Sequence, residues 1–405
     1  MSDLPTVFLV AGTRPEAIKL APVAAEMRAA GRLRPVIVAT GQHPTMVHQA
    51  LSAFGERPDV QLELDRRDGG QPDLLAELVR SLDVHLAADR PAAVLVQGDT
   101  TTTLAGAMAA FWRQVPVVHL EAGLRSGDLA APFPEEGNRR MVAQLSRLHL
   151  APTSGAAANL LDEGVPADNV LITGNTVVDA ALAVARQRAA LAEPALTETV
   201  EAAEAGRIRL VTVTAHRRES WGEPLDRVLS AVRRLLAAYP DVHVVLPTHP
   251  NPAVRAQVEA ALAGVERIVL TGPLPYQALT RLLAASFLIL TDSGGIQEEA
   301  PSFRVPVLVL REVTERMESV NAGCARLVGT DEELIMSSAA QILDDPRVRE
   351  AMVAVGNPYG DGLAARRTEQ AIAAMLGLDT MPAAMPAGGA AAPVAQPAPA
   401  ALVAA

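Results

Sequence analysis

Short apolar runs typical of strands alternate with helical segments along most of this chain, and this alternation constrains the fold most strongly. Strands that alternate with helices form βαβ units, and such units build parallel sheets. The runs fall into two series, a first at 6–10, 35–39, 93–97, 116–120, 147–151 and 169–172, and a second at 208–214, 242–247, 267–271, 286–291, 305–310 and 326–328. The sequence therefore predicts an α/β fold with two Rossmann-like, doubly wound domains.

The break between the two series sets the expected domain boundary. Residues 180–206 are rich in Ala and Glu and contain no strand-like run. We expect a first domain over 1–175, a hinge near 174–178 and a second domain over 176–362. A late helix within 363–380 is expected to pack back on the first domain. The tail 381–405 consists mainly of Ala, Pro and Gly, a composition that favours disorder.

Charge and composition exclude several classes of protein. The net charge of −11 argues against nucleic acid as the main partner. No stretch approaches the roughly 18 uninterrupted apolar residues of a membrane span. Cys324 is the only cysteine, so no intrachain disulfide can form. We expect a cytoplasmic protein with no membrane partner.

The sequence also lacks the common cofactor motifs. No GxGxxG follows a strand, as NAD binding by a Rossmann domain requires, and no Walker A motif is present. No CxxC or HxxxH spacing suggests a metal site. The expectation is that neither NAD nor a metal is used.

Polar residues follow the strands of the first series, where open parallel sheets bind ligands. Arg14 follows 6–10 beside a helix start that suits a phosphate, and Lys19, the only lysine, lies on that helix. A tight turn with a solvated arginine is the alternative. Asp99 and Glu121 follow two further runs, and Glu135 lies in the loop PFPEEGNRR. A helix N-cap at Asp99 and a solvated acid at Glu135 stay open.

The second series shows the same arrangement. His216 and Arg217 follow 208–214, although a histidine there can simply be satisfied by the backbone. The run 286–291 leads into a helix that opens with Ser293, Gly294 and Gly295. Free N–H groups at a helix start favour a pyrophosphate, and Glu299, further along the helix, can bind ribose hydroxyls.

Taken together and in order, these segments resemble the non-hydrolysing UDP-N-acetylglucosamine 2-epimerases from about residue 6 to 375. The motifs are GTRPEAIK (12–19), QH (42–43), GDTTTT (98–103), HLEAGLRSGD (119–128), PEEGNRR (134–140), TGNTVVDA (173–180), HRRES (216–220), TDSGGIQEEAPS (291–302), TERMES (314–319), RLVGT (326–330) and NPYGDG (357–362).

This resemblance implies a glycosyltransferase-B-like fold with the site in the cleft between the domains, and a homodimer. It implies anti-elimination of UDP from UDP-GlcNAc to give 2-acetamidoglucal, followed by re-addition to give UDP-ManNAc. It also implies residue roles. The catalytic candidates are Asp99, Glu121, Glu135, His216 and Lys19. The substrate-binding candidates are Arg14, Lys19, Asp99, Glu121, His216, Ser293, Gly294, Gly295, Glu299 and Arg316. Some relatives carry a second, activating substrate site, which Gln42, His43, Arg217 and His249 match.

Three other functions fit parts of the pattern. A hydrolysing 2-epimerase would use the same site and release ManNAc and UDP, but the GTRPE sequence is typical of the non-hydrolysing branch. A GT-B glycosyltransferase would share the fold but leave the acids at 99, 121 and 135 without a purpose. A non-catalytic nucleotide-sugar sensor would bind without turnover.

Overall fold

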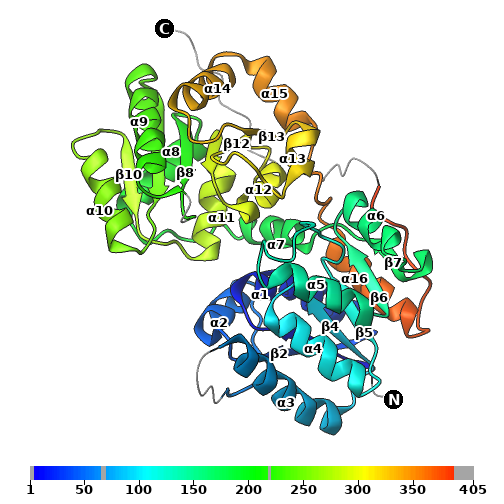
Figure 1. Cartoon of the computed structure of the whole chain (residues 1–405). Coiled ribbons are helices and arrows are strands. Elements are labelled where there is room, and N and C mark those ends of the chain that lie inside the picture. Colours follow the sequence, from blue (N-terminus) through cyan, green and yellow to red (C-terminus); the bar gives the residue numbers. More distant parts are fainter. Residues whose placement is uncertain (1–3, 65–69, 218–219, 387–405) are drawn as a thin grey trace. The chain divides into compact units, whose positions relative to one another are not determined.

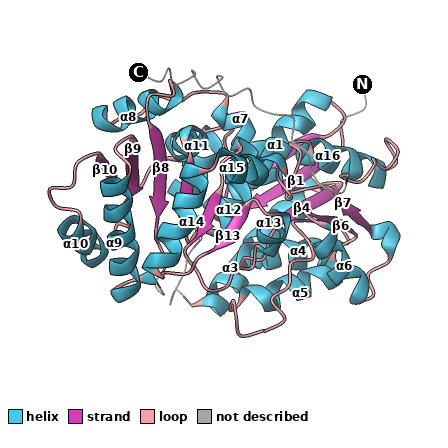
Figure 2. Cartoon of the chain, turned by 90° about the horizontal axis from the view of Figure 1, so that it is seen from above, coloured by secondary structure: helices cyan, strands magenta, loops and turns pink. Residues whose placement is uncertain are grey.

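The computed structural model describes residues 4–64, 70–217 and 220–386 (Figure 1). The chain divides into two compact units. One holds the chain through Ala180 together with the stretch that begins at Tyr359, and the other holds Ala181–Pro358. Each unit contains a parallel sheet whose strands are interleaved with helices (Figure 2). The predicted α/β fold with two parallel sheets is therefore confirmed.

The first unit has a seven-stranded sheet within the described residues, in the order β3-β2-β1-β4-β5-β6-β7. Each predicted run of the first series is a strand, and the two-residue β3 is an addition. The strands are β1 (Thr6–Ala11), β2 (Arg34–Ala39), β3 (Val60–Gln61), β4 (Ala93–Gln97), β5 (Val117–Leu120), β6 (Leu148–Ala151) and β7 (Val170–Ile172).

The strands at the centre of this sheet are covered on both faces, which explains their unbroken apolar runs. Leu9 of β1 pairs with Ile37 of β2 on one side and with Leu95 of β4 on the other, and all three are fully buried. The strand order reverses between β1 and β4. Such a topological switch point leaves a crevice for ligands beyond the carboxyl ends of the two strands.

The helices of the first unit follow its strands in turn. They are α1 (Arg14–Ala30), α2 (Pro44–Ser52), α3 (Gln71–Asp89), α4 (Thr101–Trp112), α5 (Glu135–Leu145), α6 (Ser154–Asp162), the 3-10 helix η1 (Ala167–Asn169) and α16 (Ala364–Met375), together with the first half of α7 (Thr176–Ala185), which continues into the second unit after Ala180. Helix α16, orange in Figure 1, lies against α1, and Glu369 accepts a hydrogen bond from Arg32 (3.1 Å).

The second unit has a six-stranded sheet in the order β10-β9-β8-β11-β12-β13, with its switch point between β8 and β11. Its strands are β8 (Arg209–Thr214), β9 (Val242–Pro247), β10 (Ile268–Thr271), β11 (Leu288–Thr291), β12 (Val307–Val309) and β13 (Ala325–Leu327). Its helices are α8 (Pro194–Glu204), α9 (Glu223–Ala238), α10 (Pro252–Ala261), α11 (Tyr276–Ala285), α12 (Gly294–Glu299), η3 (Ala300–Phe303), α13 (Met317–Ala322), α14 (Glu332–Asp344) and α15 (Pro346–Ala354).

Hydrogen bonds join the two places where the chain leaves and re-enters the first unit. The Asn175 N–H donates to the Tyr359 carbonyl (2.7 Å). Further along α7, the half-buried Asp179 carboxylate accepts the N–H groups of Ala364 and Ala365, which begin α16 (3.2 and 2.9 Å). These bonds tie α7 to α16.

The chain beyond α16 continues along the first unit. The Met385 N–H donates to the carbonyl of Ile172 on the edge strand β7 (2.7 Å). Residues 387–405, which make up most of the segment expected to be disordered, lie outside the described residues.

Candidate active site

The turn between β1 and α1 is built around a buried acid. The Glu16 carboxylate accepts the N–H groups of Gly12 (3.0 Å) and Thr13 (2.6 Å), the side-chain half of a capping box. Its other oxygen accepts the hydroxyls of Thr100 and Thr103 from the neighbouring switch-point loop. Burial raises the pKa of Glu16, although these hydrogen bonds lower it. Glu16 thus fixes the two loops at the switch point to each other.

Glu121 is a second buried carboxylate of the first unit that accepts several hydrogen bonds. One oxygen accepts from the Lys19 ammonium (2.5 Å) and from the Asn175 amide (2.9 Å), and the other accepts from the Gln97 amide. All four side chains are buried. The backbone of Glu121 has φ of 62°. A non-glycine residue in this left-handed region costs on the order of 1–3 kcal/mol, a strain that clusters at functional sites.

Asp99 lies after β4 and pairs with an arginine from the predicted PEEGNRR segment. The Arg139 guanidinium donates to the Asp99 carboxylate (2.5 Å), and Asn138 donates to the Asp99 carbonyl (2.9 Å). Burial raises the pKa of Asp99, Arg139 opposes this, and the charge of Glu135 raises the pKa further. Asp99 and Glu135 are therefore close enough to influence each other's charge.

Arg14, Gln42 and His43 lie around the same turn. The half-buried Arg14 side chain makes no hydrogen bond or ion pair within the described part of the chain, so its guanidinium is available to an anion. Gln42 accepts a hydrogen bond from Thr102 (2.8 Å), and the N–H of the exposed His43 donates to the Gly12 carbonyl (3.0 Å). The first unit thus brings together every site residue predicted from the first series.

In the second unit, Asp292 joins the carboxyl ends of β8 and β11. This fully buried carboxylate accepts the N–H groups of His216 and Arg217 (2.9 Å each) and the Ser220 hydroxyl (3.1 Å). Burial lowers the pKa of His216, Asp292 opposes this, and His249 lowers the pKa further. The His216 and His249 rings lie 6.1 Å apart. A neutral His216 at pH 7 follows.

Arg316 lies beside the turn that starts α12. A Cβ added to Gly294 would lie 3.2 Å from the Arg316 guanidinium carbon, so glycine leaves room for this side chain. Arg316 donates to the buried Glu298 (2.8 Å), which orients its guanidinium. Ser293 is the N-cap of α12, and the buried Glu299 is the last residue of the helix. The region around α12 in the second unit therefore combines the Arg316 cation, the small residues Ser293 and Gly294, and the Glu299 carboxylate.

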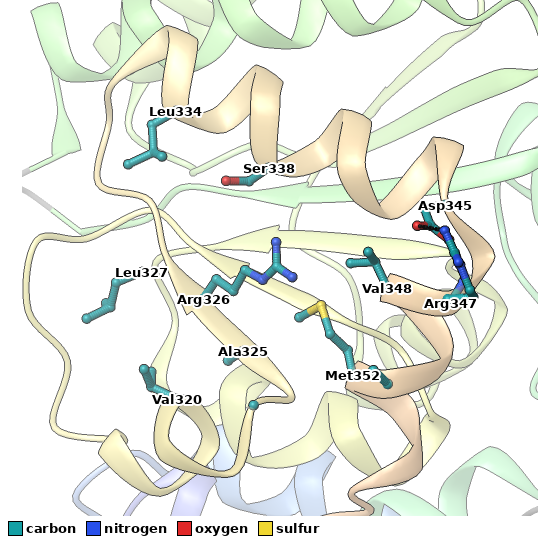
Figure 3. Close-up of a pocket in the computed structure, with 12 residues that line it drawn as sticks. Val320, Ala325, Arg326, Leu327, Leu334, Ser338, Asp345, Arg347, Val348 and Met352 are labelled. Atoms are coloured by element: carbon teal, nitrogen blue, oxygen red, sulfur yellow. Dashed lines mark hydrogen bonds and ion pairs between the residues drawn. The ribbon is translucent and has the colours of Figure 1, made fainter.

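A hollow of about 1010 Å³ in the second unit lies elsewhere. Figure 3 shows it beside the edge strand β13, with Leu327, Val348 and Met352 among its lining residues. None of the predicted site residues lines it. The predicted site residues lie instead near the switch point of each sheet, and each unit contributes its own set of candidate residues there.

Two features are absent from residues 4–64, 70–217 and 220–386. No helix there is long and apolar enough to cross a membrane. No group of three or more His, Cys, Asp or Glu side chains in the same residues could hold a metal ion.

Several residues of the candidate site were not predicted individually, among them Glu16, Arg139, Gln97 and Asn175. Glu16 has a signal in the sequence, because Thr13-x-x-Glu16 is the pattern of a capping box. Arg139 is one of two adjacent arginines, and the spacing does not indicate which of them pairs with Asp99. Gln97 and Asn175 are neutral amides without any motif chemistry, so only the structure reveals that they contact Glu121.

Two units, each with a parallel sheet and polar residues near its switch point, place the chain among α/β proteins that bind ligands beyond the carboxyl ends of their strands. Residues 25–373 match the family described as UDP-N-acetylglucosamine 2-epimerase. The chain belongs to this family, as the motifs predicted, and it is an isomerase.

Individual relatives agree with this assignment. The UDP-N-acetylglucosamine 2-epimerase of Bacillus subtilis is 43% identical over 89% of this chain and 93% of its own. A crystal structure titled UDP-N-acetylglucosamine 2-epimerase has a TM-score of 0.86 and 40% identity, covering 95% of this chain and 100% of its own. The Neisseria meningitidis enzyme bound to UDP-GlcNAc has a TM-score of 0.78 and 40% identity, covering 89% and 97%. These likenesses confirm the glycosyltransferase-B-like fold.

Proposed function

We propose that this enzyme interconverts UDP-GlcNAc and UDP-ManNAc without releasing free sugar. The observation that carries the proposal is the acid cluster at the first switch point, where Asp99, Glu121 and Glu135 gather with Lys19 and Arg139. Inverting C2 requires proton transfer on both faces of the sugar, and several carboxylates can supply it. Positioned proton transfer contributes roughly 10²–10⁴-fold to such a rate.

The reaction balances without any oxidant or reductant. A carboxylate takes the C2 proton, the C–H electron pair forms the C1=C2 bond, and the C1–O pair leaves with UDP. The products are 2-acetamidoglucal and UDP. In the return step the UDP oxygen bonds to C1 while an acid protonates C2 on the other face. The same enzyme thus runs in both directions.

The UDP must be retained between the two steps so that it can return. We propose that Arg14, Ser293, Gly294, Gly295 and Arg316 hold its phosphates. Glu299 would bind the ribose, and neutral His216 would donate a hydrogen bond to the leaving diphosphate. Stabilising the charge that develops on a leaving group is typically the largest single catalytic term. The available guanidinium of Arg14 supports this assignment.

Other expectations stay predictions here. The proposed reaction uses neither NAD nor a metal, and a cytoplasmic location and an activator site around Gln42, His43, Arg217 and His249 are still to be tested. We also propose a homodimer, supported by exposed apolar side chains in the first unit. Phe111 and Trp112 at the end of α4 are 51% and 63% exposed, and Val84 on the adjacent α3 is 64% exposed. Light scattering of Trp112→Glu against the wild type tests it.

The deciding experiment is one NMR series of the enzyme with UDP-GlcNAc in D₂O. We expect deuterium at C2 and a growing UDP-ManNAc signal, with no free sugar, before and after dialysis against EDTA. Accumulation of ManNAc with equal UDP would identify a hydrolysing enzyme. The absence of any C2 exchange would refute the epimerase proposal.

A further inference from the structure

The TGNTVVDA segment has no role in the proposed reaction, yet it reaches the acid cluster. Its Asn175 donates through the side-chain amide to the Glu121 carboxylate (2.9 Å). The other side-chain atom of the same amide accepts the Val177 N–H (3.0 Å) at the start of α7. The Asn175 backbone N–H donates to Tyr359. One side chain therefore connects the start of α7 to a catalytic candidate.

Gln97 contacts the second oxygen of the Glu121 carboxylate. It is the last residue of β4 and is buried, and its amide donates to Oε2, whereas Asn175 donates to Oε1. Each carboxylate oxygen thus receives an amide donor from a different element. Two donors on different oxygens fix the rotation of the carboxylate plane, which the Lys19 contact alone cannot do.

The backbone of Glu121 adds a reason for this support. A left-handed glutamate persists only where the surroundings hold it in place. We propose that Asn175 and Gln97 are positioning residues that hold the Glu121 carboxylate in one orientation for the reaction. This inference rests on the proposed function of Glu121.

Asn175→Asp is the sharpest variant. It is isosteric and keeps the oxygen that accepts the Val177 N–H, but it replaces the donor to Glu121 with a second acceptor. Because like charges disfavour ionisation, we expect the acid limb of the rate profile to move to higher pH. At neutral pH we expect kcat to fall about tenfold to a hundredfold, as for other losses of positioning, while KM changes little. Gln97→Glu should behave in the same way.

Asn159→Asp is the matched control, since Asn159 donates to a backbone carbonyl, that of Gly123 (2.9 Å), and not to Glu121. It should leave the position of the acid limb unchanged. A purely structural role for Asn175 would lower the rate equally at every pH, and an unmoved acid limb in both Asn175→Asp and Gln97→Glu would overturn the inference.

A second measurement does not depend on turnover. Urea unfolding of Asn175→Ala, Glu121→Gln and the double variant forms a double-mutant cycle. We expect non-additive effects, because the two side chains share one contact, and strict additivity would count against the inference. If the wild type shows no C2 exchange, the proposed function fails, and this cycle still decides whether Asn175 acts on Glu121.

Discussion

The ion pair between Lys19 and Glu121 should control both the stability of the first unit and its activity. The two side chains are 10% and 7% exposed, and the nitrogen–oxygen distance is 2.5 Å. Lys19→Met removes the cation and leaves a buried carboxylate with only its amide donors. Breaking a buried pair typically costs 3–5 kcal/mol, and because Gln97 and Asn175 remain we expect about 3 kcal/mol here.

Adding Glu121→Gln to Lys19→Met should recover much of this loss. The neutral amide no longer needs a cation, so the interaction energy of the double-mutant cycle should be about 2–3 kcal/mol. The two single variants and the double variant should each retain the secondary structure of the wild type by circular dichroism. The pattern of recovery is what distinguishes an ion pair from two independent losses of packing.

The chain offers a reporter for the first unit alone. It contains two tryptophans, and Trp112 lies in the first unit while Trp221 lies in the second. Urea unfolding followed by fluorescence in a Trp221→Phe background therefore reports the first unit. Losses that add in the double variant would refute the coupling.

Activity provides the second test of the same pair. Lys19→Arg keeps the charge, but the planar guanidinium is larger than an ammonium and does not fit the same buried contact. We expect C2 exchange to fall at least a hundredfold in Lys19→Arg. Full exchange in this variant would show that the compact ammonium is not required.

Three further outcomes are expected. Asp99→Asn should change the free energy of unfolding of the first unit by no more than about 1 kcal/mol but lower C2 exchange, measured by NMR, about 10²–10⁴-fold. Unchanged turnover would remove Asp99 from the mechanism. Burial raises the pKa of Asp179 from 3.8 to about 7, so the folded state binds this proton more tightly than the unfolded state. The free energy of unfolding should therefore fall as pH rises from about 4 to about 7, by up to about 1.4 kcal/mol per pH unit. Urea midpoints at pH 5 and 8 should show this fall in the wild type and not in Asp179→Asn. Gly12→Ala should destabilise the first unit by about 1–3 kcal/mol in urea, because the new Cβ would lie 2.0 Å from the Thr102 hydroxyl oxygen, and a neutral result would show that the turn can shift.

The sequence predicted the strands well for a physical reason. Parallel strands buried on both faces need continuous apolar runs, and β1 and β4 have them. Strand β3 has no such run, because it consists of Val60 and Gln61 at the edge of the sheet, and neither is buried. It could not be distinguished from a loop.

The candidate site was predictable where charge follows a strand, as at Arg14, Asp99 and Glu121. Its supporting contacts were not. Neutral amides such as those of Gln97 and Asn175 carry no charge that marks them in the sequence, and their role depends on which side chain they contact in the folded unit. Asp292 is a similar case, since its three donors come from the segment 216–220, far away in the sequence.

The bond between Asn175 and Tyr359 has a consequence for how the protein is made. The bond joins the two ends of a long insertion, because Ala181–Pro358 of the second unit lies in the sequence between two parts of the first. At roughly 5–20 residues per second, a ribosome needs about 10–35 s to make that insert before α16 emerges to cover α1. The first unit is thus the first to be started but the last to be completed, because its α16 is synthesised after the insert. In living cells, the part of the chain that carries the proposed acids would wait, with one helix uncovered, for the rest of the protein.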